Sequence, residues 1–473
     1  MGQEIAHDHF SPEDWREYAV RLKAETWLLR RMLENGEFSS ASAVGGFELE
    51  GWLTDPHYRP LACNQAFLQT LANPLATVEL ARFNIELNTP PRPLGSVALR
   101  EFEQALTGLL DQATTTAAQL KARLLLIGIL PSCVQDDFCL ASMSDSNRYH
   151  ALNAEILKSR HGRPIRLEID GQESLHIHHD SVMLEAATTS FQLHMQVAAE
   201  TAHHFYNAAI IASAPVLAVS GNSPFLFGRS LWQETRIPVF EQAVDAGREY
   251  PARVSFGSGF ADKSIAECFE ENLAIYPVLL PMVQDKPASR FAHLRLHNGV
   301  TWRWNRPLVG FDPDGKPHIR IEHRSLPAGP SVPDMLANAA LFYGLTQYLG
   351  AQLCAGEPLP MAFATARENF YNAARVGLGA NLRWNRQAWS VQHLMLDELL
   401  PLAAEGLEQL GIDNADIRHY LSIIAARIES GQTGAVWQQR HLQQVQGNVE
   451  RLLLDYAHLQ HTHTPVHTWA LDT

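Results

Sequence analysis

The stretch Thr188-Thr189-Ser190-Phe191-Gln192-Leu193-His194-Met195-Gln196-Val197 decides the fold of this chain. Successive side chains of a β-strand point to opposite faces, so the stretch predicts an apolar face and a polar face formed by Ser190, Gln192, His194 and Gln196. A strand with one solvated face is common in antiparallel sheets. Solvated faces are usually built from Lys, Thr, Glu and Ser, however, whereas Gln and His are side chains that bind ligands.

Three more segments, distant in the sequence, repeat this alternation. Phe47-Glu48-Leu49-Glu50 places two carboxylates on one face, Phe83-Asn84-Ile85-Glu86-Leu87-Asn88 groups Asn, Glu and Asn, and Ile319-Arg320-Ile321-Glu322-His323-Arg324 groups Arg, Glu and Arg. One interpretation is a set of separate, solvated surface charges. Each charge, however, lies within an apolar alternation that buries its strand. We therefore predict a sheet whose polar face is the floor of a functional site.

The composition limits the partners of the protein. With 473 residues, 46% of them hydrophobic, the chain is long enough for one large domain with an extra lobe or for two domains. Its 51 acidic and 37 basic residues give a formal charge of −14. This charge argues against nucleic acid or an anionic membrane as the main partner, but it leaves room for a local basic pocket.

Cysteine usage and apolar runs bear on the cellular compartment. The 5 cysteines are scattered and form no CxxC pair, which favours reduced thiols in the cytoplasm. Residues 1–10 are polar and lack a signal-peptide core, and the longest apolar runs, 124–130 and 208–219, are shorter than the ~18 residues of a membrane span. We expect a soluble cytoplasmic protein without a membrane partner, with a homo-oligomer as an open possibility.

Hydrophobic periodicity predicts an α+β fold in four parts. Residues 1–44 carry a helix over 12–35, 45–330 form the sheet core, 331–460 are mainly helical, and 461–473 form a polar tail that we expect to be frayed. Within the core, the patterns predict a hairpin at Asp170-Gly171, helices over 99–123 and 198–212, and strands over 124–130, 216–219, 293–297 and 301–306.

Five motifs follow one another in order, each on a predicted strand or in the loop after it. They are Glu48-Leu49-Glu50, Asn84-Ile85-Glu86-Leu87-Asn88-Thr89-Pro90, Phe191-Gln192-Leu193-His194, Asn222-Ser223-Pro224-Phe225 and Ile321-Glu322-His323-Arg324. With these motifs the chain resembles the glutamate–cysteine ligase type 2 family, the carboxylate–amine ligases of the glutamine synthetase superfold. The resemblance implies a curved antiparallel sheet with helices on its outer face, and a concave face that holds ATP, Mg²⁺ and the substrates.

The resemblance also implies roles for individual residues. The metal ligands would be Glu48, Glu50, Glu86, His194 and Glu322. The nucleotide would contact Gln192, His194, Gln196 and Arg324. The catalytic residues would be Glu86 and Arg324, with Arg324 stabilising the transferred phosphoryl group. A substrate-carboxylate pocket would include Asn222, Arg229 and Arg236. A structural role for His194, and a solvated or ion-paired state for the two loop arginines, are the alternatives.

These residue types suit amide formation. A carboxylate is a poor electrophile, so a phosphoryl group from ATP must first convert it to an acyl phosphate, which the amine then attacks. Magnesium prefers oxygen ligands, which explains carboxylates rather than cysteines. Four glutamates on one face would repel one another without cations. We expect an ATP- and Mg²⁺-dependent ligase that joins a small-molecule carboxylate, such as that of glutamate, to a small-molecule amine.

Other functions and sites stay open. A non-catalytic nucleotide- or metabolite-binding regulatory protein, or a phosphotransferase on the same scaffold, would fit the same motifs. Segments 132–163 and 245–290 match no glutamate or cysteine pocket, so the sequence leaves both substrates undefined. His176, His178 and His179 are zinc-ligand candidates of lower rank, with a polar strand end as the alternative, and His461, His463 and His467 are metal-binding candidates in the expected tail. The sequence contains no Walker or dinucleotide motif.

Overall fold

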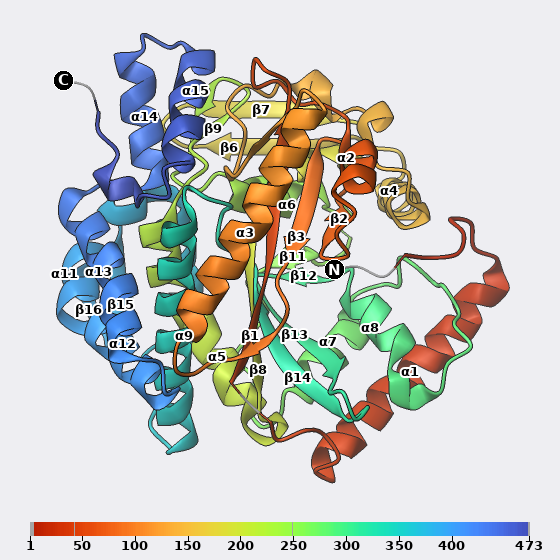
Figure 1. The fold of residues 1–473 in the computed structure, drawn as a ribbon. Coiled ribbons are helices and arrows are strands. Elements are labelled where there is room, and N and C mark those ends of the chain that lie inside the picture. The colour runs from red at the N-terminus through yellow and green to blue at the C-terminus, as the bar shows by residue number, and fades with distance from the viewer. Residues whose placement is uncertain (1–3, 42, 248, 472–473) are drawn as a thin grey trace.

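One antiparallel sheet forms the centre of the molecule (Figure 1). The computed structural model describes residues 4–41, 43–247 and 249–471. The strands run in the order β13-β14-β8-β1-β3-β2. Their bounds are β13 Asn305–Phe311, β14 Pro317–His323, β8 Phe191–Val197, β1 Val44–Thr54, β3 Asn84–Asn88 and β2 Ala76–Val78. Two short strands, β4 (Arg92–Pro93) and β5 (Arg123–Leu125), also pair with β1.

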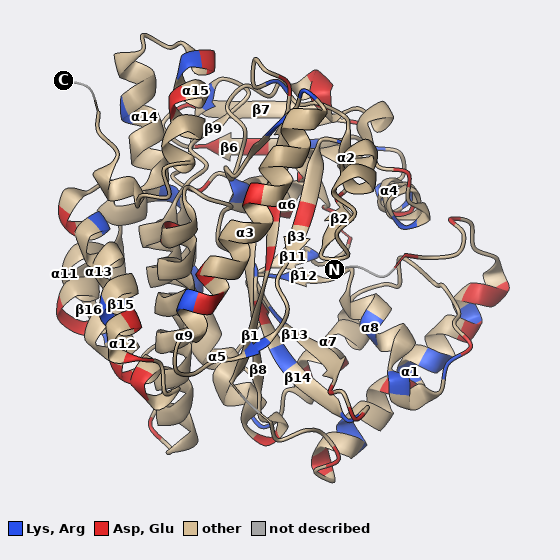
Figure 2. Cartoon of the chain, viewed as in Figure 1, with Lys and Arg blue, Asp and Glu red and all other residues tan. Residues whose placement is uncertain are grey.

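The strand register brings the polar positions of the four motifs side by side. Glu50 lies opposite Glu86 on β3, and Glu48 lies opposite Gln192 on β8. His194 lies opposite Glu322 on β14. Because the side-chain period of a strand is two, these residues all project from the same face of the sheet. Figure 2 shows acidic positions on β1 and β3 and basic positions on β13 and β14.

Helices cover the apolar face of the sheet. They are α3 (Ala98–Gln119), α5 (Ala202–Ser220) and α9 (Val332–Cys354). Phe47 on β1 packs against Phe102 of α3 at 4.5 Å between ring centroids, and it also stacks on Tyr343 of α9. The Tyr343 hydroxyl donates to the carbonyl of His194. The helix layer is thus fastened to the strand that carries the central polar motif.

A second group of segments covers part of the polar face. It contains α1 (Pro12–Glu34), α4 (Asn147–Ser159), a short 3₁₀ helix (Val182–Ala187), α6 (Arg236–Ala243), α7 (Ala266–Ile275) and α8 (Ala292–Asn298). The buried Glu25 of α1 fixes α8, because its carboxylate lies 2.6 Å from His293 Nδ1 and accepts the backbone N–H of Leu294. The hairpin of β6 (Ile165–Asp170) and β7 (Ser174–His179) lies beyond α6.

The segment after α9 is mainly helical. Its elements are α10 (Phe363–Val376), α11 (Val391–His393), α12 (Leu400–Gln409), α13 (Asn414–Ser430), α14 (Gly434–Gln444), α15 (Val449–Gln460) and the hairpin β15 (Asn381–Trp384) and β16 (Gln387–Ser390). The remaining short elements are α2 (Asn64–Leu71), β9 (Phe225–Leu226), β10 (Arg229–Ser230), β11 (Val254–Ser255) and β12 (Trp302–Arg303). Helices α9 and α12 cross closely at Gly344 and Gly406.

Several predicted elements are wrong. Residues 216–219 continue helix α5 through Pro215, and residues 293–297 form helix α8 rather than a strand. The strand expected over 124–130 ends at Leu125. The strand expected over 301–306 is divided between β12 and β13. Short apolar runs do not distinguish a buried helix from a strand, which accounts for residues 216–219. Residues 293–297 alternate as a strand does, and tertiary contacts override that pattern.

The segment after α15 is packed rather than frayed. Val466 and Trp469 are 0% and 2% exposed. The Gln432 side chain donates to the carbonyls of both residues, and the backbone N–H of Val466 donates to the carboxylate of Asp334. Two apolar anchors within a polar sequence therefore suffice to hold residues 461–471 on the helical part.

Candidate active site

A cleft opens on the polar face of the sheet, beneath α4, α8 and the 3₁₀ helix. Strands β1, β3, β8, β13 and β14 contribute its floor. Six carboxylates line the cleft, those of Glu48, Glu50, Glu79, Glu86, Glu185 and Glu322. Five guanidinium groups also line it, those of Arg148, Arg295, Arg306, Arg320 and Arg324. The cleft therefore gathers opposite charges from segments that span most of the chain.

The first group of potential metal ligands is Glu48, His194 and Glu322. One ligand atom from each lies within 4.8 Å of the others. His194 Nε2 lies 3.1 Å from Glu48 Oε1, yet neither ring nitrogen makes a hydrogen bond within the described residues, and both nitrogens are buried. Such buried nitrogens beside two carboxylates fit a divalent cation, for which the carboxylates supply the oxygen ligands that Mg²⁺ prefers.

Two arginines surround Glu322. Arg306 Nε and Nη2 donate to its two carboxylate oxygens at 2.8 and 3.1 Å, and Arg324 Nη1 donates to Oε2 at 2.9 Å. Burial alone would raise the pKa of Glu322, but the charges of Arg306 and Arg324 outweigh it and hold the pKa below its usual value. Arg324 Nη1 also donates to Gln192 Oε1. Glu322 therefore remains an anion that can bind a metal while it orients Arg324.

The second group of potential metal ligands is Glu50, Glu79 and Glu86. Ligand atoms of all three lie within 4.8 Å of one another. Glu50 accepts hydrogen bonds from Ser190 N and Gln192 Nε2, each at 2.7 Å. Burial raises the pKa of Glu86 and, more strongly, that of Glu79, and neighbouring carboxylates raise both further. Because this all-oxygen set is destabilised by its own charge, it fits a hard cation such as Mg²⁺.

Most residues predicted for the site meet in the cleft. Glu48, Glu50, Glu86, Gln192, His194, Glu322 and Arg324 come together on the polar face. Gln196 does not reach this group, because it lies further along β8 and donates to Asp312 Oδ1 at 3.2 Å. Gln196 lies opposite Arg320 on β14, and its contact with the nucleotide stays a prediction.

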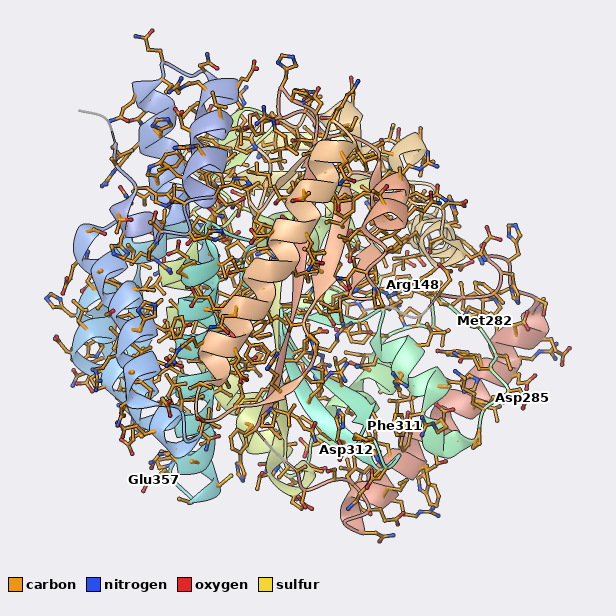
Figure 3. The ribbon with its side chains drawn as sticks, viewed as in Figure 1. Arg148, Met282, Asp285, Phe311, Asp312 and Glu357 are labelled. Carbon is orange, nitrogen blue, oxygen red and sulfur yellow. The ribbon has the colours of Figure 1, made fainter. Side chains whose placement is uncertain are left out.

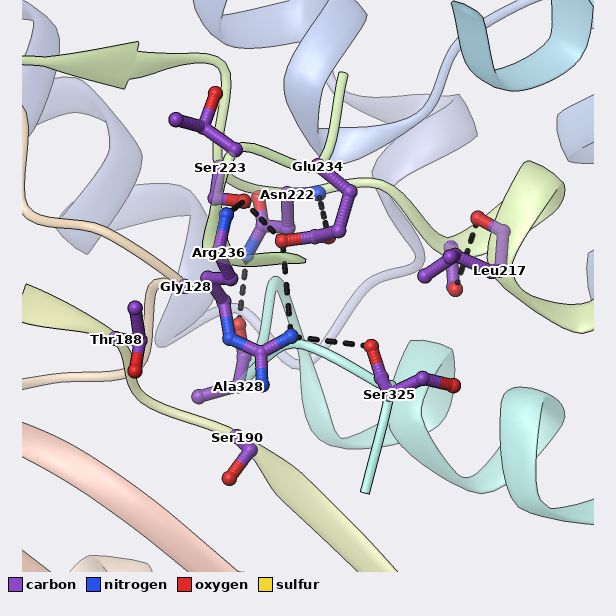
Figure 4. Close-up of polar contacts among 12 residues, drawn as sticks. Gly128, Thr188, Ser190, Leu217, Asn222, Ser223, Glu234, Arg236, Ser325 and Ala328 are labelled. Atoms are coloured by element: carbon purple, nitrogen blue, oxygen red, sulfur yellow. Dashed lines mark hydrogen bonds and ion pairs between the residues drawn. The ribbon is translucent and has the colours of Figure 1, made fainter. Parts of the chain in front are cut away.

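The three residues predicted for a substrate pocket lie outside the cleft wall. Asn222 is fully buried and donates to the carbonyl of Ala328 (Figure 4). It also donates to the Tyr456 hydroxyl and accepts from Gln438. Arg229 is exposed and pairs with Glu173 at 2.9 Å, which is the ion-paired alternative. Neither residue is therefore placed to form the predicted substrate-carboxylate pocket. The Asn222 side chain is occupied by hydrogen bonds within the protein, and the Arg229 side chain by a surface ion pair.

Arg236 is not among the residues that line the cleft, and it lies next to the backbone that follows β14. Its Nη1 donates to the carbonyl of Ser325 at 3.0 Å and lies 3.7 Å from Glu234 (Figure 4). Glu234 in turn accepts from the hydroxyl of Ser223. Since Arg236 is 2% exposed and holds the backbone after Arg324, its contacts favour a positioning role over direct contact with a substrate.

Sequence reasoning missed several charged residues of the cleft. Arg306 lies directly opposite Glu322 on β13, so strand alternation was a usable signal for it. Arg320 was placed on the polar face with Glu322 but was given no role in the site. Glu79 follows β2, Glu185 lies on the 3₁₀ helix and Arg148 begins α4. These three come from irregular or helical segments, where no alternation marks them.

The end of the cleft near β14 is basic. Arg295 and Arg320 line it, and the guanidinium groups of Arg290 and Arg295 lie 3.9 and 5.6 Å from the ring centre of Phe311. Within the described part of the chain, none of the three arginines forms an ion pair. Figure 3 labels Phe311 and Arg148, which lie below and above α8 in that view. The two ends of the cleft therefore differ in charge.

The fold and the polar face define a member of the carboxylate–amine ligase group. The chain matches the glutamate–cysteine ligase family 2 over residues 45–455 and belongs to that family. The family resemblance and the fold class expected from the sequence, α+β with a curved antiparallel sheet and a helical lobe, are thereby confirmed.

Solved structures agree on the fold. A glutamate–cysteine ligase from Francisella tularensis in complex with AMP shares 11% identity and a TM-score of 0.54, over 90% of each chain. A bifunctional glutathione synthetase from Pasteurella multocida shares 10% identity and a TM-score of 0.54, over 91% of this chain and 54% of that one. A search among curated proteins finds no match. Among the described residues, every helix is too short or too polar to span a membrane.

Proposed function

We propose that this protein is an ATP- and Mg²⁺-dependent ligase that joins a carboxylate to an amine through an acyl phosphate. The observation that carries the proposal is the pair of potential metal-ligand groups in the cleft. The first is Glu48, His194 and Glu322 with two arginines beside it, and the second is Glu50, Glu79 and Glu86. Family membership supports the ligase class, and the AMP complex of the Francisella ligase supports a nucleotide site. The charges of the cleft support the chemistry that we describe next.

The first step would be phosphoryl transfer. A carboxylate oxygen of the substrate attacks the γ-phosphorus, the bond to the β–γ bridging oxygen breaks, and ADP leaves with the electron pair. Mg²⁺ bound by the two acidic groups would supply neutralisation of the phosphate charge. Arg324, held by Glu322 and Gln192, would point its guanidinium at the transferred group, and removal of such a donor typically costs about 10²–10³ in rate.

The second step would form the amide. The amine nitrogen attacks the acyl carbon, the carbon–oxygen bond to phosphate breaks, phosphate leaves and the nitrogen loses a proton. Helices α4 and α8 would exclude water here, because Leu152 and Leu296 line the cleft above the strands. Exclusion of water matters, because it would otherwise hydrolyse the acyl phosphate.

The charge difference between the ends of the cleft supports one orientation of the substrates. The polyphosphate and base of the nucleotide would lie toward Arg295 and Arg320, where arginines without acidic partners can bind phosphate and stack on a base. The carboxylate and amine substrates would then lie toward Glu79, Glu185 and Arg148 at the other end.

Replacement of Glu86 by Gln tests the proposal. Glu86→Gln keeps the size of the side chain and its hydrogen bond with Asn88, which is 2.8 Å long, but it removes one anionic ligand. We expect amine-dependent ADP release to fall at least about 100-fold while circular dichroism stays unchanged. The control is Glu429→Gln on the exposed surface of α13. Full activity of Glu86→Gln would exclude the assigned metal site.

The same assay separates the other functions. A phosphorylated product without amide would identify a phosphotransferase. Nucleotide binding without turnover, across a panel of acids and amines, would identify a regulatory protein.

A further inference from the structure

Glu185 is a carboxylate of the cleft that neither potential metal group uses. It lies on the 3₁₀ helix Val182–Ala187, and its side chain lines the cleft at the end opposite Arg320. Within the described residues its carboxylate has no hydrogen-bond or ion-pair partner. Burial raises the pKa of Glu185 to about 8, and the charge of Glu50 adds to this effect, whereas Arg324 and Arg148 oppose it. The side chain is part-buried, and a carboxylate that is withdrawn from water without a partner is costly, so a bound cation would stabilise it.

Apolar side chains line the same cleft as Glu185, beside the charged groups. Leu152, Val182 and Trp302 line the same cleft, together with the ring of Tyr149. Apolar side chains combined with a few placed polar groups are usual in a site that orients a small organic ligand.

Among the described residues that line the cleft near Glu185, the cationic side chains are Arg324, which the proposed mechanism assigns to the phosphoryl group, and Arg148, which remains for the carboxylates of both substrates. Arg148 donates to the carbonyl of Gly299 through Nη2 at 3.4 Å, and its Nε is buried without a partner. Arg236 pairs with Glu234, and Arg229 pairs with Glu173 on the surface. If Arg148 binds a carboxylate of the acid substrate, a carboxylate on the amine substrate would have no cationic side chain to bind here.

We propose that Glu185 binds the positively charged part of the amine substrate, and that this substrate is an amine without a carboxylate, of which a short diamine is the simplest. The inference rests on the proposed ligase function and narrows it. A carboxylate-bearing amine would place its negative charge beside Glu185 and the glutamates of the second metal group. Neighbouring like charges repel one another, so binding of such an amine would be unfavourable.

Three amines of matched size test the substrate class. Propylamine, 1,3-diaminopropane and 4-aminobutyrate share a three-carbon chain with an amine on the first carbon, and they differ in the substituent on the third carbon, which is hydrogen, an ammonium group or a carboxylate. With glutamate and other small acids as the carboxylate, amide formation is followed by mass spectrometry and ADP release. We expect kcat/KM for both amines without a carboxylate to exceed that for 4-aminobutyrate at least tenfold. The reverse order would overturn the inference while leaving the ligase function intact.

Variants at Glu185 test the residue. Glu185→Gln should raise KM for 1,3-diaminopropane at least about tenfold, because a charge-assisted hydrogen bond is lost, while KM for ATP changes less than about twofold. Glu185→Asp should recover part of the effect, and Glu429→Gln should have none. An unchanged KM and amine order in Glu185→Gln would overturn the assignment, and calorimetry with Mg²⁺ and ADP would show that the variant is folded.

A binding measurement keeps the inference separate from the proposed function. If no amine yields an amide, the ligase proposal fails. Ligand-observed NMR with the same three amines, in the presence of Mg²⁺ and ADP, then decides the role of Glu185. Binding of 1,3-diaminopropane that is lost in Glu185→Gln would support that role, and equal binding by both proteins would exclude it.

Discussion

Glu241 is a part-buried residue outside the cleft, and hydrogen bonds to its carboxylate fix two aromatic side chains. It accepts from Trp304 Nε1 at 2.9 Å and from the Tyr371 hydroxyl at 2.7 Å. Burial raises its pKa from 4.5 to about 7, although both hydrogen bonds act in the opposite direction. The folded protein therefore binds more protons than the unfolded chain between these two pH values, and Glu241 makes stability fall as the pH rises from 4.5 to about 7.

This linkage predicts a pH-dependent effect of Glu241→Gln. The free energy of unfolding of the variant minus that of the wild type should increase by about 1–3 kcal/mol between pH 4.5 and a pH above 7. The reason is that the variant does not have to form a charge at this position. Urea unfolding at a series of pH values measures the difference. A difference that is independent of pH would contradict the raised pKa of Glu241, and Glu429→Gln is the exposed control.

Residues on strands were the predictable part of the site. Glu48, Glu50, Glu86, Gln192, His194, Glu322 and Arg324 could be grouped from the sequence because alternation fixes their face. Whether the strands are adjacent, and in which register, depends on long-range pairing that alternation does not encode. Glu79, Glu185 and Arg148 could not be found, because they reach the cleft from turns and helices whose positions depend on the tertiary fold.

Among the elements, α8 shows how tertiary contacts override a local pattern. The alternating sequence of residues 293–297 suggests a strand, yet Glu25 of α1 accepts the N–H of Leu294 near the start of a helix and binds His293. A carboxylate at this position stabilises a helix N-terminus. This contact spans 268 residues of sequence, so no local window contains it.

The crossing of α9 and α12 depends on two glycines. A Cβ atom added to Gly406 would lie 1.9 Å from the carbonyl oxygen of Gly344, and one added to Gly344 would lie 2.3 Å from the carbonyl oxygen of Ala403. Both contacts are with backbone atoms, so the helices would have to move apart. The absence of a side chain thus allows the helices to pack at this short distance.

Gly406→Ala should therefore lower the free energy of unfolding by about 1–3 kcal/mol, the usual cost of overpacking. Its control is Gly108→Ala in helix α3, where an added Cβ meets no atom within 4 Å and where alanine is favoured by about 1 kcal/mol. Thermal unfolding should shift in opposite directions for the two variants. A stabilising effect of Gly406→Ala would contradict the close crossing.

For the whole molecule, the acidic groups of the cleft link stability to metal binding. Glu50, Glu79 and Glu86 repel one another when ionised, so a cation that binds only the folded protein should stabilise it. We expect millimolar MgCl₂ to raise Tm by several degrees relative to NaCl of equal ionic strength, and EDTA to reverse the shift. The Glu86→Gln variant should show a smaller shift, and an equal shift in both proteins would place the binding elsewhere.

The last helix is hydrogen-bonded to loops at the centre of the protein. Tyr456 donates to the carbonyl of Leu126 and accepts from Asn222, and Gln460 donates to the carbonyls of Leu126 and Pro330. During synthesis every proposed ligand leaves the ribosome well before Gln460 does. A nascent chain, or a product truncated before α15, therefore has all of its catalytic groups but lacks the bonds that hold the loops behind them, and it would be a substrate for chaperones and proteases rather than an enzyme.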